Sequence, residues 1–151
     1  MYDSQLPFVD LYRALAEYAG DDAYADILEP WLDANPGELH WIGDFERRAN
    51  HNWSAATDED VCRLYSLFRV TSLLLLRFQT GRADGTDYQG PVTQIEGIQL
   101  FLEQLGFHIP EARDYHPFYH EILSVNEAER NEDPVEIIEV HWPCFMLGDM
   151  I

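Results

Sequence analysis

The stretch "DEDVCRLYSLFRVTSLLLLRFQT", residues 58–80, carries the longest helix signal in the chain. Its apolar residues recur at helical spacing, and Thr57 with Asp60 three residues later matches a capping box at the start. Gly81 follows as a natural terminator. Its most apolar part, residues 61–78, contains three arginines and is shorter than a comfortable membrane span. It therefore predicts a long, buried helix inside a helical protein.

Four further helices are predicted from apolar periodicity and from residues that begin or end helices. The first runs from a Ser4 cap to Gly20, and the second opens at Asp21 or Asp22 and ends at "NPG", residues 35–37. The third covers about 37–50. The fourth covers about 93–105, with Thr93 and Glu96 as a second capping-box pattern. The expected fold is mainly α: a bundle of about five helices forming one domain over residues 1–151.

The pattern changes after residue 107. Two runs, "FYHEILSV" (118–125) and "VEIIEVHW" (135–142), are rich in aromatic and β-branched residues, which favours strands. A small C-terminal β-hairpin fits residues 118–142, and so does a helix followed by a short strand. The chain closes on the apolar segment "CFMLGDMI", 144–151, which either packs on the core or meets a partner.

The charge of the chain is strongly negative. It holds 28 acidic residues against nine basic ones, all of them arginine, for a formal net charge of −19. Residues 1–38 carry −8, residues 39–90 carry −1 and residues 91–151 carry −10. A chain of this kind avoids nucleic-acid backbones and is steered toward basic partners, more strongly at low salt.

Two acidic clusters stand out. We name the first cluster the acidic stripe, because its members are spaced at the helical repeat. Trp31 adjoins the stripe and is a candidate aromatic anchor for a partner. The second lies in the polar segment between the two C-terminal runs. The stripe consists of Asp22, Asp26, Glu29 and Asp33, and the second cluster is represented by Glu127, Glu129 and Glu132.

We predict that these residues form a partner-binding surface. The alternative is that they are only a solvated acidic face. Small, acidic, mainly helical domains of this type resemble bacterial immunity proteins and other inhibitors that neutralise a basic enzyme. The resemblance implies a stoichiometric inhibitor that occludes the basic site of a toxin or of an enzyme acting on nucleic acid. Its carboxylates would stand where phosphates otherwise bind, as a nucleic-acid mimic. Neither catalysis nor a cofactor is expected.

A second hypothesis starts from "DYHPFYHEILSV", residues 114–125, where His116 and His120 are four apart. Such a pair can bind a metal from one face of a helix or strand, so a metal-dependent hydrolase is an alternative. Glu121 follows the second histidine rather than the first, unlike a zincin helix, and Pro117 disfavours a helical backbone at His116. Packing or capping histidines are the plainer interpretation, and no metal is assigned.

A third hypothesis is a structural or regulatory subunit that buries its apolar tail in an oligomer. The isolated cysteines Cys62 and Cys144 are expected to be free and buried, although the sequence leaves a disulfide between them open. A cytoplasmic location is expected, because no secretory signal pattern is visible.

Overall fold

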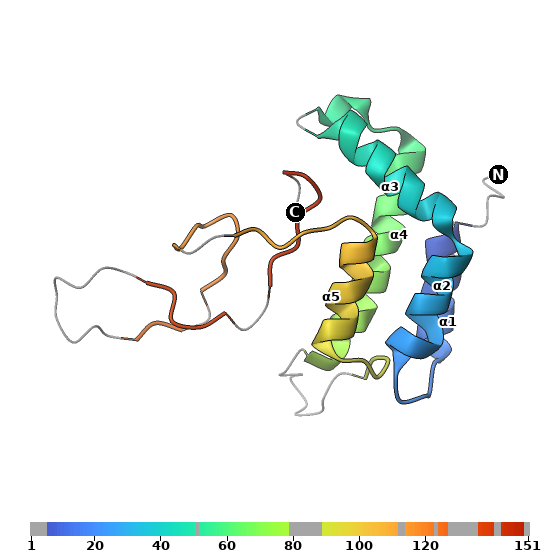
Figure 1. Ribbon diagram of the computed structural model, residues 1–151, viewed down its shortest axis with the longest axis horizontal. Coiled ribbons are helices and arrows are strands. Elements are labelled where there is room, and N and C mark those ends of the chain that lie inside the picture. The colour runs from blue at the N-terminus through green and yellow to red at the C-terminus, as the bar shows by residue number, and fades with distance from the viewer. Residues whose placement is uncertain are drawn as a thin grey trace. The chain divides into compact units, whose positions relative to one another are not determined.

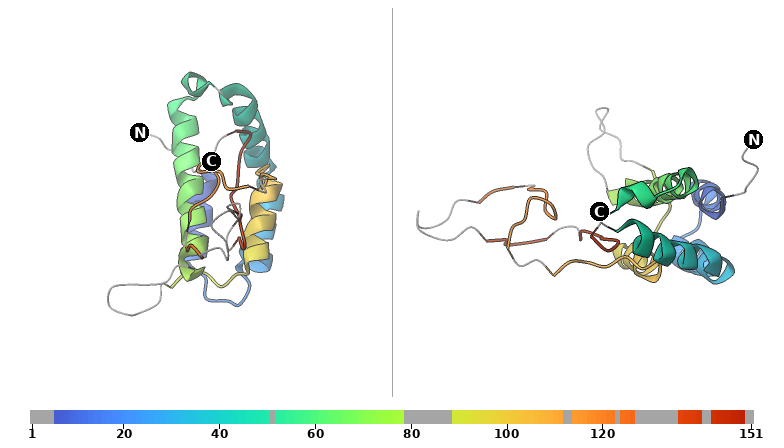
Figure 2. Two further views of the ribbon diagram at one scale, coloured as in Figure 1. Left: turned by 90° about the vertical axis from the view of Figure 1, so that its left-hand side faces the viewer. Right: turned by 90° about the horizontal axis from the view of Figure 1, so that it is seen from above.

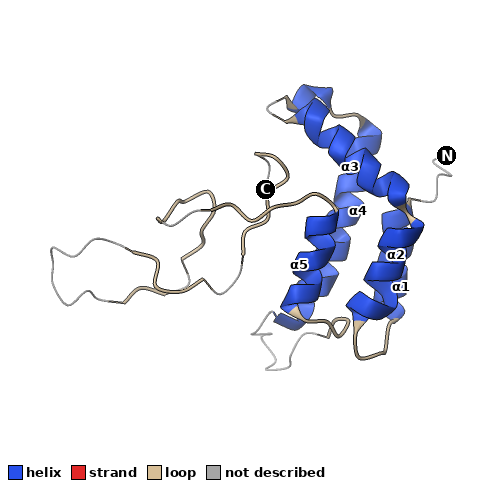
Figure 3. Ribbon diagram, viewed as in Figure 1, coloured by secondary structure: helices blue, strands red, loops and turns tan. Residues whose placement is uncertain are grey.

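The computed structural model describes seven segments of the chain, which divides into two compact units, Met1–Gly106 and Phe107–Ile151. We call them the helical unit and the C-terminal unit. Within the described residues all five α-helices lie in the helical unit (Figures 1 and 3), which confirms the mainly helical prediction. That residues 1–151 form one domain stays a prediction. The described residues are 6–50, 52–78, 89–111, 114–122, 124–126, 136–140 and 143–149.

The helical unit also contains one π-helical turn and two short 3₁₀ turns. In chain order its elements are α1 (Pro7–Glu17), the π-turn η1 (Tyr24–Leu28), α2 (Glu29–Ala34), α3 (Pro36–Ala49), the 3₁₀ turn η2 (Trp53–Ala55), α4 (Asp58–Leu75), the 3₁₀ turn η3 (Leu76–Phe78) and α5 (Ile95–Gln104).

Helix α1 begins at Pro7, with Leu6 as its N-cap residue. Proline suits the first position of a helix because its missing N–H would have no helical acceptor there. The predicted cap, Ser4, lies outside the described residues. The predicted inward positions Phe8, Leu11 and Leu15 are buried.

The predicted second helix consists of two parts. Residues 24–28 form a π-turn, and α2 continues from Glu29 to Ala34. The backbone N–H of Ala23, just before the π-turn, donates to the carbonyl of Val92 at 2.7 Å. The start of this segment is therefore fixed by a residue nearly seventy positions away, which local periodicity cannot reveal.

The start of α4 is as predicted, because both hydrogen bonds of the Thr57–Asp60 capping box are present. The helix ends at Leu75 and passes into the 3₁₀ turn 76–78. The predicted end at residue 80 and the terminator Gly81 lie outside the described residues. α4 is not buried all round, because Val61, Tyr65 and Phe68 are exposed.

The predicted capping box of the last helix is wrong. α5 begins at Ile95 with Gln94 as its N-cap residue, and no side chain caps it. The Thr93 side chain is buried beside Gly97, and its hydroxyl donates to the Gln94 carbonyl at 3.4 Å instead of capping α5. The predicted stop is confirmed: Gly106 has φ +95°, a left-handed conformation that favours glycine.

Aromatic rings link four of the helices in the core. The Phe8 ring on α1 lies 5.0 Å from that of Trp31 on α2 and 6.4 Å from that of Trp41 on α3. Trp31 also contacts Phe101 on α5 at 6.2 Å, edge to face. Figures 1 and 2 show α1 beside α4 and α2 beside α5, and residue contacts support both pairings.

The predicted C-terminal hairpin is not formed by the residues that the structure describes. Residues 118–122, 124–126 and 136–140 contain no strand and no helix, and the rest of the predicted hairpin lies outside the described residues. One isolated antiparallel bridge joins His108 to Met146. Met146 and Leu147 of the apolar tail are buried.

No helix in the described part of the chain is long and apolar enough to cross a membrane.

Candidate functional site

Two members of the acidic stripe also shape the backbone. Asp22 accepts hydrogen bonds from the backbone N–H groups of Tyr24 (3.1 Å) and Ala25 (3.3 Å), as a residue that begins a helical turn does. The Tyr18 hydroxyl donates to Asp26 and accepts from the Asp22 N–H at 2.9 Å. The phenol therefore holds the two acidic residues in a fixed relation at the start of the π-turn.

The other two members, Glu29 and Asp33, point to solvent from α2, one helical turn apart. No ion pair joins either one to any residue that the structure describes. Asp26 is exposed as well. The structure thus places three exposed carboxylates on one continuous segment, residues 26–33. The π-turn holds more residues per turn than an α-helix, so the strict α-helical repeat assumed from Asp22 onward is interrupted.

The candidate anchor Trp31 is half-buried. Its indole N–H donates to the Pro7 carbonyl at 3.3 Å, and its ring packs between Phe8 and Phe101. Trp53 is the exposed tryptophan among those that the structure describes, with 59% of its surface accessible. It follows α3 and lies 6.1 Å from the Phe45 ring. The sequence could not distinguish Trp53 from the half-buried tryptophans Trp31 and Trp41.

The predicted second acidic cluster, Glu127, Glu129 and Glu132, lies outside the described residues.

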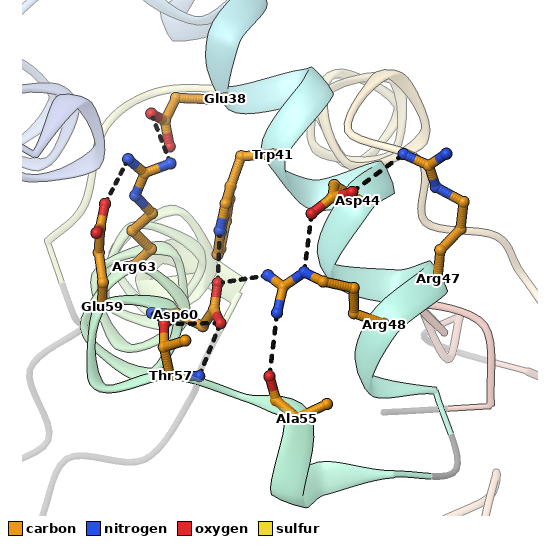
Figure 4. A network of polar contacts seen from close by, with 10 residues as sticks. All are labelled: Glu38, Trp41, Asp44, Arg47, Arg48, Ala55, Thr57, Glu59, Asp60 and Arg63. Carbon is orange, nitrogen blue, oxygen red and sulfur yellow. Dashed lines mark hydrogen bonds and ion pairs between the residues drawn. The ribbon is translucent and has the colours of Figure 1, made fainter.

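A polar network joins α3 to α4 around the buried carboxylate of Asp60 (Figure 4). Asp60 accepts from the Trp41 indole N–H at 2.9 Å and from the Arg48 guanidinium at 3.0 Å. It also accepts from the backbone N–H of Thr57 at 2.8 Å and from the Thr57 hydroxyl at 2.9 Å. Arg48 extends the network to Asp44 at 2.8 Å and to the Ala55 carbonyl at 3.0 Å.

These contacts decide the charge of Asp60. Burial alone would raise its pKa, but hydrogen bonds from the Thr57 backbone, Trp41 and Arg48 together hold the pKa well below the usual range. The carboxylate is ionised near neutral pH. An acid with so low a pKa is a poor proton donor or base there, so Asp60 acts by binding its neighbours.

The second arm of the network centres on Arg63 of α4. Its guanidinium lies 2.8 Å from Glu59, 3.6 Å from the buried Glu38 and 5.2 Å from the centre of the Trp41 ring. Burial raises the pKa of Glu38, and the Arg63 charge opposes that shift. Oε2 of Glu38 and Nε of Arg63 are buried, and neither has a hydrogen-bond partner among the residues that the structure describes. This pair is thus less completely satisfied than Asp60.

His116 and His120 lie in a turn, and the rings of both residues form hydrogen bonds with the local backbone. Nδ1 of His116 accepts from the Phe118 N–H at 3.2 Å. Nδ1 of His120 lies 2.9 Å from the backbone N and 3.1 Å from the backbone O of His116. The His116 ring stacks on Tyr119 at 4.7 Å. Among the residues that the structure describes, no three His, Cys, Asp or Glu are placed to hold a metal ion.

The two cysteines are free, as predicted. Cys62 is exposed on α4, contrary to the expected burial, whereas Cys144 is half-buried and burial raises the pKa of its thiol.

The chain was compared with known protein families, curated proteins and solved structures, and none of them matches it.

Proposed function

We propose that the protein is an acidic binding protein, an inhibitor of immunity type that occludes a basic site on a toxin or on an enzyme acting on nucleic acid. One observation carries the proposal: Asp26, Glu29 and Asp33 present exposed carboxylates on one short helical segment of a chain with net charge −19. Glu29 and Asp33 have no counterion among the described residues. Their charges are therefore free to meet a partner.

The scaffold under these carboxylates is fixed. Leu28 and Leu32 are buried beneath the segment, Trp31 packs on Phe8, and Tyr18 donates to Asp26. A fixed display lowers the conformational entropy lost when the charges meet guanidinium or ammonium groups. Attraction between opposite charges would accelerate encounter, and the carboxylates would then occupy positions where a basic site holds phosphates.

The test is reversal of the two unpaired charges, Glu29→Arg with Asp33→Arg. These positions are preferable to Asp22, whose side chain binds local backbone N–H groups, and to Asp26, whose side chain accepts from the Tyr18 hydroxyl. The matched control is Glu96→Arg with Glu103→Arg, the same change in net charge at exposed positions on α5. Partners captured by the tagged wild-type protein from its source cells are identified, and their binding to each variant is measured at several salt concentrations.

We expect the α2 variant to lose affinity for a basic partner by about 10- to 100-fold, since several close charge pairs are reversed. The α5 control should lose much less, and wild-type association should slow steeply with added salt. A partner without a basic surface, an on-rate insensitive to salt, or equal losses for the two double variants would each reject the proposal. Circular dichroism spectra of both variants verify that the helices remain formed.

A further inference from the structure

We propose that Glu38 is a proton-binding site of the folded protein, through which mild acidification strengthens the contact between α3 and α4. The proposal is independent of the inhibitor function. It rests on the burial of the Glu38 carboxylate, on its lack of hydrogen bonds, and on the competition of a second carboxylate for the one cation beside it.

The Glu38 carboxylate is buried without the contacts that normally stabilise a buried charge. The residue lies in the first turn of α3 and is 5% exposed, and no hydrogen bond from a described residue reaches its carboxylate. Its Oε1 atom lies 3.6 Å from the Arg63 guanidinium, which is beyond hydrogen-bond distance. Such a carboxylate is stabilised by binding a proton, because desolvation penalises mainly its charged form.

One guanidinium is shared between two carboxylates. Arg63 donates a hydrogen bond to Glu59 at 2.8 Å, and its guanidinium also lies over the Trp41 ring, 5.2 Å from the centre. Figure 4 shows Arg63 between Glu38 and Glu59. Since Glu59 takes the hydrogen bond, Glu38 retains only a more distant attraction to Arg63 and also meets the negative charge of Glu59.

The pKa of Glu38 follows from these contacts. Burial raises the pKa most, the Arg63 charge lowers it, and the Glu59 charge raises it again. The next carboxylate on α4, Asp60, is bound by Arg48. The charged side chains of α1 and α2 are all exposed: Asp10, Arg13, Glu17, Glu29 and Asp33. The protonation of Glu38 is therefore governed by its burial and by the two charged residues on α4.

The two arms of the network respond oppositely to pH. The folded-state pKa of Glu38 is raised, so its contribution to stability is full below its ordinary pKa of 4.5 and is lost as the pH rises through the folded-state value. The contribution of Asp60 is full above pH 3.8. Protonation of Glu38 also leaves Arg63 to Glu59 alone. The contact between α3 and α4 should therefore be firmer in mild acid than at neutral pH.

The first experiment follows the side-chain carboxyl carbon of Glu38 in the full chain by NMR, from neutral to acidic pH. We expect a titration midpoint above 4.5, and the Arg63 Nε signal should move with the same midpoint, because protonation removes one of its two carboxylates. Glu59→Gln should lower the midpoint, since Arg63 is then free to bind Glu38. The matched control is Asp58→Asn, which removes the same charge from the neighbouring exposed position and should leave the midpoint unchanged.

The second experiment measures unfolding by denaturant for wild type and Glu38→Gln as the pH falls from neutral to below 4.5. The ratio of their folding constants, wild type over variant, should rise several-fold and level off below 4.5. Effects of acidification on the net charge act on both proteins and cancel.

If Glu38→Gln does not fold, the titrations of wild type and Glu59→Gln decide alone. Three results would each overturn the proposal. They are a midpoint at or below 4.5, equal shifts of the midpoint by Glu59→Gln and Asp58→Asn, and a ratio that stays flat or falls on acidification.

Discussion

At the scale of single residues, Asp60 connects two helices through one carboxylate. Replacing it by Asn keeps the shape but removes the charge that Arg48 and the Trp41 indole bind. We expect Asp60→Asn to lower the free energy of unfolding by about 1–3 kcal/mol, the usual loss when a buried hydrogen-bonded group is left unsatisfied. Chemical denaturation measures this change in the free energy of unfolding. Asp44→Asn is the control, because Asp44 binds the same guanidinium from a more exposed position, and its loss should be clearly smaller.

The same residue predicts a pH dependence. The folded-state pKa of Asp60 is depressed from its ordinary value of 3.8, so its stabilising contribution is full above that value. As the pH falls below 3.8, the unfolded state binds the proton first and the contribution is lost. The stability difference between wild type and Asp60→Asn should therefore be constant near neutrality and shrink below about pH 4. The raised pKa of Glu38 acts in both proteins and cancels. A difference that grows on acidification would contradict this account.

The sequence predicted the local contact of Asp60 with Thr57 but not its contacts with Trp41 and Arg48. Thr57 and Asp60 form a local pattern that names both hydrogen-bond partners. Trp41 and Arg48 are 19 and 12 positions from Asp60, so their contact depends on how α3 packs against α4. The same applies to the tryptophans. Composition marks them as core or anchor residues, but only the packing separates the half-buried Trp31 from the exposed Trp53.

At the scale of secondary-structure elements, α5 packs closely on the π-turn at Gly97. A Cβ atom there would lie 2.9 Å from Cβ of Tyr24 and 3.0 Å from the Thr93 hydroxyl, closer than ordinary contact. We expect Gly97→Ala to lower stability by about 1–3 kcal/mol, as overpacking does, although alanine favours helices. Thermal and denaturant unfolding measure the change.

The control for that change is Gly43→Ala in α3, where an added Cβ meets nothing within 4 Å. Here helix propensity acts alone, and stability should rise by up to about 1 kcal/mol. If both alanine variants shifted stability in the same direction, the close packing of α5 on the π-turn would not be the cause.

Periodicity predicted the five α-helices because each buries a regular apolar stripe. It did not predict the π-turn, where Asp22 caps the backbone and Val92 accepts from Ala23. It also assigned Thr93 to a cap, whereas the threonine hydroxyl lies beside Gly97 and donates to the Gln94 carbonyl. The apolar run 58–80 predicted complete burial. The helix instead exposes one apolar face, and composition alone cannot tell a core helix from one with a free surface.

At the scale of the whole molecule, the net charge of −19 sets the salt dependence of the proposed binding. The acidic stripe would bind basic surfaces, and added salt should weaken that contact by screening the attraction. The acidity is concentrated at the two ends of the sequence, and residues 39–90 carry only −1. The location of the apolar face could not be predicted, because it depends on which side of α4 meets α1.

The ring cluster around Phe8 determines what tryptophan emission reports during unfolding. Trp31 and Trp41 both contact Phe8, and through Trp31 and its edge contact with Phe101 the cluster includes rings from α1, α2, α3 and α5. Loss of packing among these helices changes the surroundings of both indoles at once. Trp53 is already solvated and adds a nearly constant, red-shifted background. Emission from Trp31 and Trp41 is therefore a built-in probe of inter-helix packing, whereas circular dichroism follows the helices themselves.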